Sequence, residues 1–91
     1  MRTIRLSRQA GAFLNQLPAK HARQIAEKLH RLAEDAEAIP SESLKGYAPM
    51  RRLRAGEYRI IFIIADDSVE IRLIGERNDD EIYKVLERSE K

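Results

Sequence analysis

The run Ile60–Ile64, with the sequence Ile-Ile-Phe-Ile-Ile, constrains the fold of this chain more than any other stretch. Consecutive side chains of a strand point to opposite faces of a sheet, so an all-apolar strand has to be covered on both faces. We therefore predict that residues 58–65 form a central strand, with helices packed on one side of the sheet. The segment Ala55-Gly56-Glu57 just upstream is typical of a tight turn, which makes residues 50–54 the neighbouring strand of a hairpin.

Two amphipathic helices are predicted in the first half of the chain. After a short alternating strand at residues 3–6, Ser7 can cap a helix that continues to Leu17. Pro18 is unsuited to the interior of a helix but fits the first turn of a second one. That helix has apolar residues three and four apart and ends at Ile39-Pro40, because the residue before a proline avoids helical angles. The short break between the two helices predicts an antiparallel helical hairpin.

The second half of the chain is predicted to complete the sheet and to end in a helix. Residues 41–46 have the composition of a loop, and residues 69–75 alternate as a further strand with Ile71 and Leu73 expected on one face. A short C-terminal helix is predicted over residues 79–88, with one of its first two aspartates as the cap. The predicted fold class is α+β, with an N-terminal strand and helical hairpin packed on a mainly antiparallel sheet of about four strands.

Composition limits the class of protein. With 91 residues and neither linker nor repeat, residues 1–91 are predicted to be a single domain. The chain has no cysteine, which excludes disulfides and zinc–thiolate sites. No stretch has the apolar core of a signal peptide or the roughly 20 apolar residues of a membrane span, so we expect a soluble, cytoplasmic protein without membrane contact. The net charge of +2 is too small to indicate a partner by itself, but its distribution is informative.

The predicted hairpin concentrates positive charge. Around its turn, five basic residues accompany a single acid, Glu57, and these basic residues are Lys45, Arg51, Arg52, Arg54 and Arg59. Alternation places Arg52 and Arg54 on the same face of the strand, and the turn brings Arg59 close to them. Like charges held this closely repel each other, so the cluster suits a bound anion, and phosphate matches the planar fork of a guanidinium.

Arg77 and Tyr83 extend this candidate site toward the C-terminus. Arg77 follows the last predicted strand and Tyr83 comes about one and a half helical turns later, so both can converge with the hairpin arginines. The set suits RNA cleavage without metal, in which a 2′-hydroxyl attacks its own phosphate. Arginines would stabilise the extra negative charge, and the tyrosine would stack on a base or move a proton. Periodicity alone is equally compatible with the arginines being a solvated sheet edge.

Other polar residues give no comparable pattern. His21 and His30 do not share a helical face and are interpreted as surface or boundary residues. The pairs Asp66-Asp67 and Asp79-Asp80 are explained by a turn and a helix cap, without partners at metal-ligand spacing. Tyr58 is interpreted as a packing residue. There is no glycine-rich phosphate loop, and we expect neither a cofactor nor a metal.

Three segments together, LKGY, MRRLRAGEYRIIFII and IGERNDDEIYK, resemble the RelE/ParE superfamily of bacterial toxins, and most of all its RelE branch. The resemblance covers nearly the whole chain and implies a RelE-like fold. It also implies a toxin of a type II toxin–antitoxin system that enters the ribosomal A site and cleaves messenger RNA there, leaving a cyclic phosphate. A small cognate antitoxin would neutralise it.

The resemblance implies roles for individual residues. Arg52 and Arg54 match the pair of basic catalytic residues before the turn, and Arg59 matches the phosphate-binding arginine of the next strand. Arg77 matches the arginine that donates a proton or stabilises charge, and Tyr83 matches the tyrosine that stacks on the substrate base. RNA phosphates are also expected to meet the neighbouring basic residues Lys45 and Arg51.

One departure from the family pattern concerns proton transfer. The family's presumed general base is a lysine, and this chain has Arg52 there, whose guanidinium essentially cannot lose its proton. Arg52 then acts only by its charge, or another group takes the proton, or the enzyme is slow. YoeB-like relatives use a glutamate and a C-terminal histidine, and no histidine lies near Tyr83, so that arrangement is not expected.

Three functions are consistent with the sequence: a ribosome-dependent messenger RNA endonuclease, a ParE-like inhibitor of DNA gyrase without nuclease activity, and an inactive toxin acting as an antitoxin-binding co-repressor. The expected partners are an antitoxin encoded in the adjacent reading frame, the ribosome and messenger RNA. Operator DNA is expected as a partner only of the toxin–antitoxin complex. An amphipathic antitoxin segment is expected to cover an apolar edge of the sheet and helices.

Overall fold

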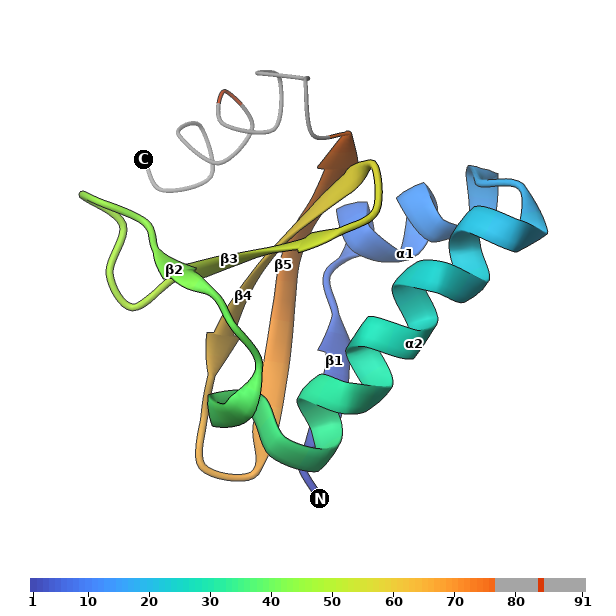
Figure 1. Ribbon diagram of the computed structural model, residues 1–91. Helices are drawn as coiled ribbons and strands as arrows, with labels where there is room; N and C mark the ends of the chain where they lie inside the picture. Colours follow the sequence, from blue (N-terminus) through green and yellow to red (C-terminus); the bar gives the residue numbers. More distant parts are fainter. Residues whose placement is uncertain (77–83, 85–91) are drawn as a thin grey trace.

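The computed structural model describes residues 1–76 and Lys84. In chain order its elements are β1 (Thr3–Leu6), α1 (Arg8–Gln16), α2 (Ala19–Asp35), the 3-10 turn η1 (Ala36–Ala38), β2 (Glu42–Ser43), β3 (Arg51–Ala55), β4 (Tyr58–Ile64) and β5 (Ser68–Glu76). Figure 1 shows both helices on one side of the sheet, which confirms the predicted α+β class. The helix predicted over residues 79–88 lies outside the described residues.

The strands form one sheet in the order β1-β5-β4-β3-β2. β1 runs parallel to β5 and the other neighbours pair antiparallel, so the predicted mainly antiparallel sheet with β4 at its centre is confirmed. Within residues 1–76 the sheet has five strands where about four were expected, because Glu42–Ser43 pairs with Arg51–Arg52. A strand of two residues is too short to show alternation, which is why this segment was predicted as part of a loop.

The helical hairpin begins as predicted. The Ser7 hydroxyl accepts a hydrogen bond from the backbone N–H of Ala10 at 3.1 Å and donates to the carbonyl of Arg72 at 2.7 Å, so the cap also ties α1 to β5. Pro18 lies at the N-cap position of α2, immediately before its first turn, and its carbonyl accepts from the backbone N–H of Ala22. Its missing N–H costs nothing there, because the first N–H groups of a helix have no helical partner.

The two faces of the sheet differ in what they carry. We call the side on which α1 and α2 pack the helix face; its core joins strand residues to helix residues such as Ile25 and Leu32. The other side, which we call the arginine face, has a smaller apolar cluster of Leu44, Met50, Ile61 and Leu73. β4 is apolar on both faces because it contributes to both clusters, as predicted from its sequence.

The predicted alternation of β5 is wrong at one point. Ile71 and Leu73 were expected on the same face, but the register between β4 and β5 shifts so that Ile61 pairs with Leu73 while Phe62 pairs with Ile71. Arg72 is therefore an extra residue on β5, as in a β-bulge. Because of it, Ile71 lies in the core under the helices and Leu73 lies on the arginine face.

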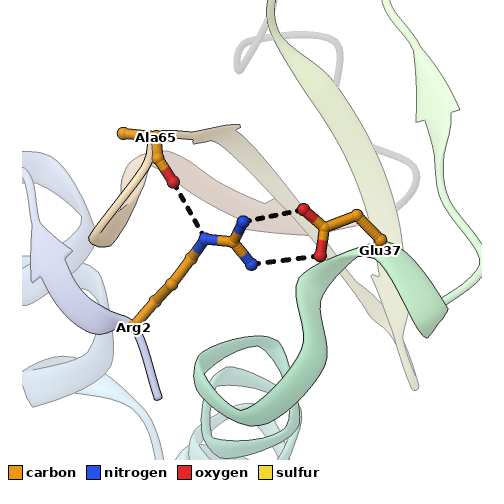
Figure 2. Close-up of polar contacts among 3 residues, drawn as sticks. All are labelled: Arg2, Glu37 and Ala65. Carbon is orange, nitrogen blue, oxygen red and sulfur yellow. Dashed lines mark hydrogen bonds and ion pairs between the residues drawn. The ribbon is translucent and has the colours of Figure 1, made fainter.

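Arg2 forms hydrogen bonds at the end of the sheet that lies away from the β3–β4 turn (Figures 1 and 2). Its Nε donates to the carbonyl of Ala65 at 2.8 Å, and its two terminal nitrogens donate to the carboxylate of Glu37 at 3.0 and 2.8 Å. Its backbone N–H donates to the carbonyl of Ala33. The hydrogen bonds from Arg2 hold the pKa of the Glu37 carboxyl below its ordinary value. One side chain thus joins the N-terminus, η1 and the end of β4.

Within the described residues, no helix is long and apolar enough to cross a membrane.

Candidate phosphate-binding site

The β3–β4 hairpin brings three arginines together. Arg54 pairs directly with Arg59 across the two strands, and Arg52 pairs with Ile61 two positions further along. Residues two apart on a strand share a face, so all three arginines lie on the arginine face, as the sequence predicted. Side chains of directly opposed residues start only about 4.5–5.5 Å apart at Cβ, a distance at which two like charges repel.

The tip of this hairpin is held against the helices by Tyr58. Its ring meets Phe13 edge to face, with 5.9 Å between ring centroids, and meets His21 in the same way at 5.6 Å. The Tyr58 hydroxyl and the His21 Nδ1 share a hydrogen bond of 3.1 Å. Tyr58 is a packing residue and His21 a boundary residue, as predicted, and together they fix the backbone from which Arg59 projects.

Gly56 makes the turn possible. Its φ is +62°, a conformation that residues with a side chain rarely adopt, and a Cβ at this position would overlap the side chain of Gln24 on α2. The hairpin tip therefore approaches α2 closely at the one position that has no side chain. This fixes the position of the strand pair that carries Arg54 and Arg59.

Glu42 adds a carboxylate to the arginine cluster. It pairs with Arg52 across β2 and β3, and the Arg52 guanidinium donates to it at 2.7 Å. That hydrogen bond, with the positive charges of Arg52, Arg54 and Arg59, holds the pKa of the Glu42 carboxyl below its ordinary value. Its side chain is 69% exposed, whereas that of Arg52 is 25% exposed. The site thus combines three guanidinium groups with one accessible carboxylate.

Sequence reasoning missed Glu42 because it lies in the segment predicted as a loop. One signal was present: Glu42 is the single acid between residues 38 and 56, the stretch that leads into the arginines. An isolated acid beside a basic hairpin is a candidate partner for it. Its position ten residues before Arg52 gave no period from which to predict the cross-strand pair.

Two of the remaining predicted site residues, Arg51 and Lys45, lie outside the arginine cluster. Arg51 is on the helix face of β3, where its guanidinium donates to the hydroxyl and carbonyl of Ser41 and to the hydroxyl of Ser43, at 2.7 to 3.0 Å. These bonds hold the β2 segment to β3 and occupy the side chain. Lys45 is exposed in the turn after β2. Arg77 and Tyr83 lie outside the described residues.

The three arginines of the cluster differ in how far they are buried. Arg54 is exposed, while Arg52 and Arg59 are half-buried, and the Nε atom of Arg59 is shielded from solvent. A charge that is partly withdrawn from water acts more strongly on a nearby anion, because less solvent screens it. The arrangement can therefore hold a phosphate and stabilise additional negative charge on it.

Comparisons with known proteins define the class to which this architecture belongs. The structure superposes on a double mutant of Escherichia coli toxin RelE in the free state with a TM-score of 0.75, 20% sequence identity and 96% of each chain covered. It superposes on the archaeal RelE–RelB complex from Pyrococcus horikoshii with a TM-score of 0.71 and 24% identity, covering 85% of this chain and 96% of that one. For the toxin–antitoxin complex RelBE2 from Mycobacterium tuberculosis the TM-score is 0.73, with 23% identity and coverage of 84% and 98%. The fold is that of the RelE toxins.

The sequence itself identifies the family. Residues 4–81 match the model of the family described as the ParE toxin of the type II toxin–antitoxin system parDE. The match spans most of the chain, and the chain belongs to this family within the RelE/ParE superfamily. It is a toxin of a type II toxin–antitoxin system. No curated protein sequence gives a significant match.

Proposed function

We propose that this toxin is an endoribonuclease that cleaves messenger RNA in the ribosomal A site without a metal ion. The observation that carries the proposal is the convergence of Arg52, Arg54 and Arg59 on one face of the hairpin, with the Glu42 carboxylate beside them. In the reaction, a ribose 2′-oxygen bonds to the adjacent phosphorus and the bond to the 5′-oxygen of the next nucleotide breaks. The products are a 2′,3′-cyclic phosphate and a free 5′-hydroxyl.

The arginines supply charge stabilisation in this reaction. The pentacovalent phosphorane carries one more negative charge than the phosphodiester, and Arg54 and Arg59, directly opposed on the two strands, can contact its oxygens from two sides. In the free toxin the same two side chains repel each other. Phosphate binding relieves this repulsion, so the site binds anions more tightly than an isolated arginine would.

Glu42 supplies the proton acceptor that Arg52 cannot. The guanidinium stays protonated at any physiological pH, whereas the lowered pKa of the Glu42 carboxyl keeps it ionised and able to accept a proton. Surrounded by arginines, it is a weak base. When a phosphate binds to the arginines, their charges are partly neutralised, and the pKa of Glu42 rises toward the range in which a general base is effective. The carboxylate then takes the 2′-hydroxyl proton as the bond to phosphorus forms.

Dependence on the ribosome follows from what the cluster lacks. Arginines bind a phosphate but do not hold the 2′-oxygen in line with the leaving 5′-oxygen, and that alignment accounts for a large part of the rate. The ribosome supplies it by fixing the codon. Arg77 and Tyr83 remain predicted contributors, as charge stabiliser or proton donor and as the residue that stacks on a base.

The partner that neutralises the toxin is proposed to be a small antitoxin from the adjacent reading frame. Several of the structures with this fold are complexes of a RelE toxin with a RelB antitoxin or a peptide of it. An antitoxin that binds across the arginine face would exclude RNA sterically, and operator DNA would be bound only by the complex of the two proteins.

The test is induction of the toxin without antitoxin, followed by mapping of messenger 5′ ends on ribosomes. We expect new ends at codon-spaced positions, and their rate of appearance should fall about 10²- to 10³-fold in Arg59→Ala, the loss typical for removal of one charge-stabilising group. Arg23→Ala is the matched control, since Arg23 is an exposed arginine of α2 and not part of the β3–β4 hairpin. Growth arrest with intact messengers would contradict the proposal.

A second function is favoured by the family description, which names ParE. In this alternative the toxin inhibits DNA gyrase without cleaving RNA. The order of arrest after induction separates the two: translation stops first if messenger RNA is the target, and DNA replication stops first if gyrase is. Arg59→Ala would leave arrest of replication unchanged if the arginine cluster served only RNA.

A further inference from the structure

A hollow lies beside the outer edge of β3, next to the N-terminal end of β2. β2 pairs with Arg51 and Arg52, whereas β3 continues to Ala55, and no described strand pairs with that last part on its outer side. Figure 1 shows that the chain reaches β2 from α2 and η1, so that the segment before β2 does not follow β3. Pro40 has no backbone N–H with which to extend the ladder, which accounts for the separation at this point. The space between residues 39–41, β3 and α2 is a cavity of about 440 Å³.

The charges around this hollow are unbalanced. Among the described residues, Arg52 and Arg54 line it from β3 and Lys28 lines it from α2, against one carboxylate, that of Glu42. Three positive charges and one negative charge give these described lining residues a net charge of +2. Lys28 is half-buried, and no described residue forms an ion pair with it. An ammonium group without a counter-ion in a concave, basic surface attracts an anion.

Apart from Ser41, the other described residues of the lining are apolar. Ile39, Pro40 and Leu53 form a wall of the hollow, against which a sugar or a base can pack. A volume of 440 Å³ lies in the range of roughly 300–1,000 Å³ that is usual for sites of small organic ligands. Inorganic phosphate would satisfy the cations but leave this wall exposed to water, whereas a nucleotide would use both.

We propose that the hollow is a binding subsite for one nucleotide of single-stranded RNA adjacent to the cleaved bond, with Lys28 binding its phosphate. The inference rests on the proposed function and extends it to a residue outside the hairpin. Arg52 and Arg54 belong both to the hollow and to the arginine cluster, so the two sites are continuous. A polyanion with regularly spaced phosphates fits such a row of cations, and this continuity favours an RNA strand over an acidic protein segment.

The first test measures binding by the full-length toxin alone. The probe is a trinucleotide with a 2′-deoxyribose at its central position, which removes the attacking hydroxyl, and inorganic phosphate is the second probe. We expect Lys28→Met to weaken trinucleotide binding about three- to tenfold, and to reduce the slope of log affinity against log salt by about 0.7, the value for one lost phosphate contact on a single strand. Inorganic phosphate should bind more weakly than the trinucleotide, because it leaves the apolar wall exposed to water, and Lys28→Arg should restore the trinucleotide affinity.

Lys20→Met is the matched control. Lys20 is exposed on the first turn of the same helix and lies outside the hollow, so the identical change of charge should leave trinucleotide binding unaltered. Methionine keeps most of the apolar stem of lysine, and thermal unfolding of each variant verifies that the fold is intact. Equal affinities for Lys28→Met and the unaltered toxin, or equal losses for Lys28→Met and Lys20→Met, would overturn the proposal.

The second test separates the subsite from the function and from the antitoxin. On ribosomes, Lys28→Met should raise the half-saturating concentration of toxin more than it lowers the maximal cleavage rate, whereas Arg59→Ala should lower the maximal rate. Cleavage that depends on Arg59 but not on Lys28 would overturn the subsite and leave the proposed function standing. Weaker antitoxin binding by Lys28→Glu with unchanged trinucleotide affinity would assign the hollow to an acidic protein segment and overturn the proposal as well.

Discussion

The two faces of the β3–β4 hairpin are built from alternate residues of the same strands, yet only the arginine face carries the cluster of Arg52, Arg54 and Arg59. On the helix face, Leu53, Ile60 and Phe62 are at most 3% exposed and form the main core with the helices. On the arginine face, Arg54 and Arg59 oppose each other at the position where an apolar pair would stabilise the sheet. The helix face therefore contributes most of the core, whereas the arginine face combines a smaller apolar cluster with like charges that repel each other. Stability and activity should be separable by substituting neighbouring residues.

The largest effect on stability is expected from the helix face. Phe62 is fully buried in the main core, and Phe62→Ala should lower the free energy of unfolding by about 3–5 kcal/mol through lost burial and the cavity left behind. Denaturant unfolding measures the loss. In a domain of this size the loss is comparable to the whole stability, so antitoxin-bound protein is the form in which the variant can be purified. A loss below about 1 kcal/mol would mean that the helices contribute little to the sheet.

A smaller loss is expected where the two faces are joined, at the hairpin turn. Gly56→Ala should cost about 1–2 kcal/mol, because alanine at a φ of +62° is strained. The variant should also lower activity, since the turn positions Arg59. Pairing it with Gln24→Ala distinguishes the causes: if the added methyl acts by pushing against the Gln24 side chain, the double variant recovers part of the stability. If backbone strain dominates, the double variant is no more stable than Gly56→Ala.

A change of opposite sign is expected on the arginine face. Arg54→Ala removes one of two like charges directly opposed across the strands, so the free energy of unfolding should rise by roughly 0.2–1 kcal/mol at low salt, with a smaller gain at high salt. Messenger cleavage should fall at the same time. Arg51→Ala is the informative comparison, because Arg51 lies on the other face and its hydrogen bonds hold β2. It should destabilise the protein. If Arg54→Ala and Arg51→Ala instead destabilised the protein equally, the proposed difference between the two faces would be wrong.

The sequence predicted the hairpin better than its surroundings, for a physical reason. The apolar run of β4 and the turn at Gly56 are strong local signals, and strand alternation then placed Arg52, Arg54 and Arg59 together. One feature of the sheet escaped prediction because it depends on contacts between segments. The bulge at Arg72 is a property of the pairing of β4 with β5, and it moved Leu73 to the arginine face.

Two residues of the candidate sites, Glu42 and Lys28, were not predicted for the same reason. Glu42 lies on a strand of two residues that exists only because β3 is beside it, and so has no pattern of its own. Lys28 lies on α2, and its position beside Arg52 and Arg54 depends on how α2 packs against the sheet. Local periodicity assigns a residue to a face of its own element. It does not say what lies opposite that face.

The smallest effects on stability concern Glu37 and Glu42, the two glutamates whose carboxyls have lowered pKa values. Glu37 is hydrogen-bonded to Arg2, which ties the N-terminus to the end of the sheet, and Glu42 is hydrogen-bonded to Arg52 in the arginine cluster. For both, the folded-state pKa lies below the unfolded value, so their contribution to stability is present above the unfolded pKa and is lost as the pH falls through the folded one. Stability should therefore decline as the pH falls below about 4.5.

Replacing each arginine partner separates these contributions at neutral pH. Arg2→Met should destabilise the protein, because it removes the bonds to Glu37 and Ala65 without relieving any repulsion. Arg52→Met loses the bond to Glu42 but also weakens the repulsion that Arg54 and Arg59 experience, so its loss at low salt should be smaller. Denaturant unfolding at pH 7 and at pH 3 measures both variants, and each should be less acid-sensitive than the unaltered protein. If Arg2→Met and Arg52→Met lost equal stability at pH 7, repulsion among the arginines would not destabilise the fold. The repulsion proposed to favour phosphate binding would then lose its support.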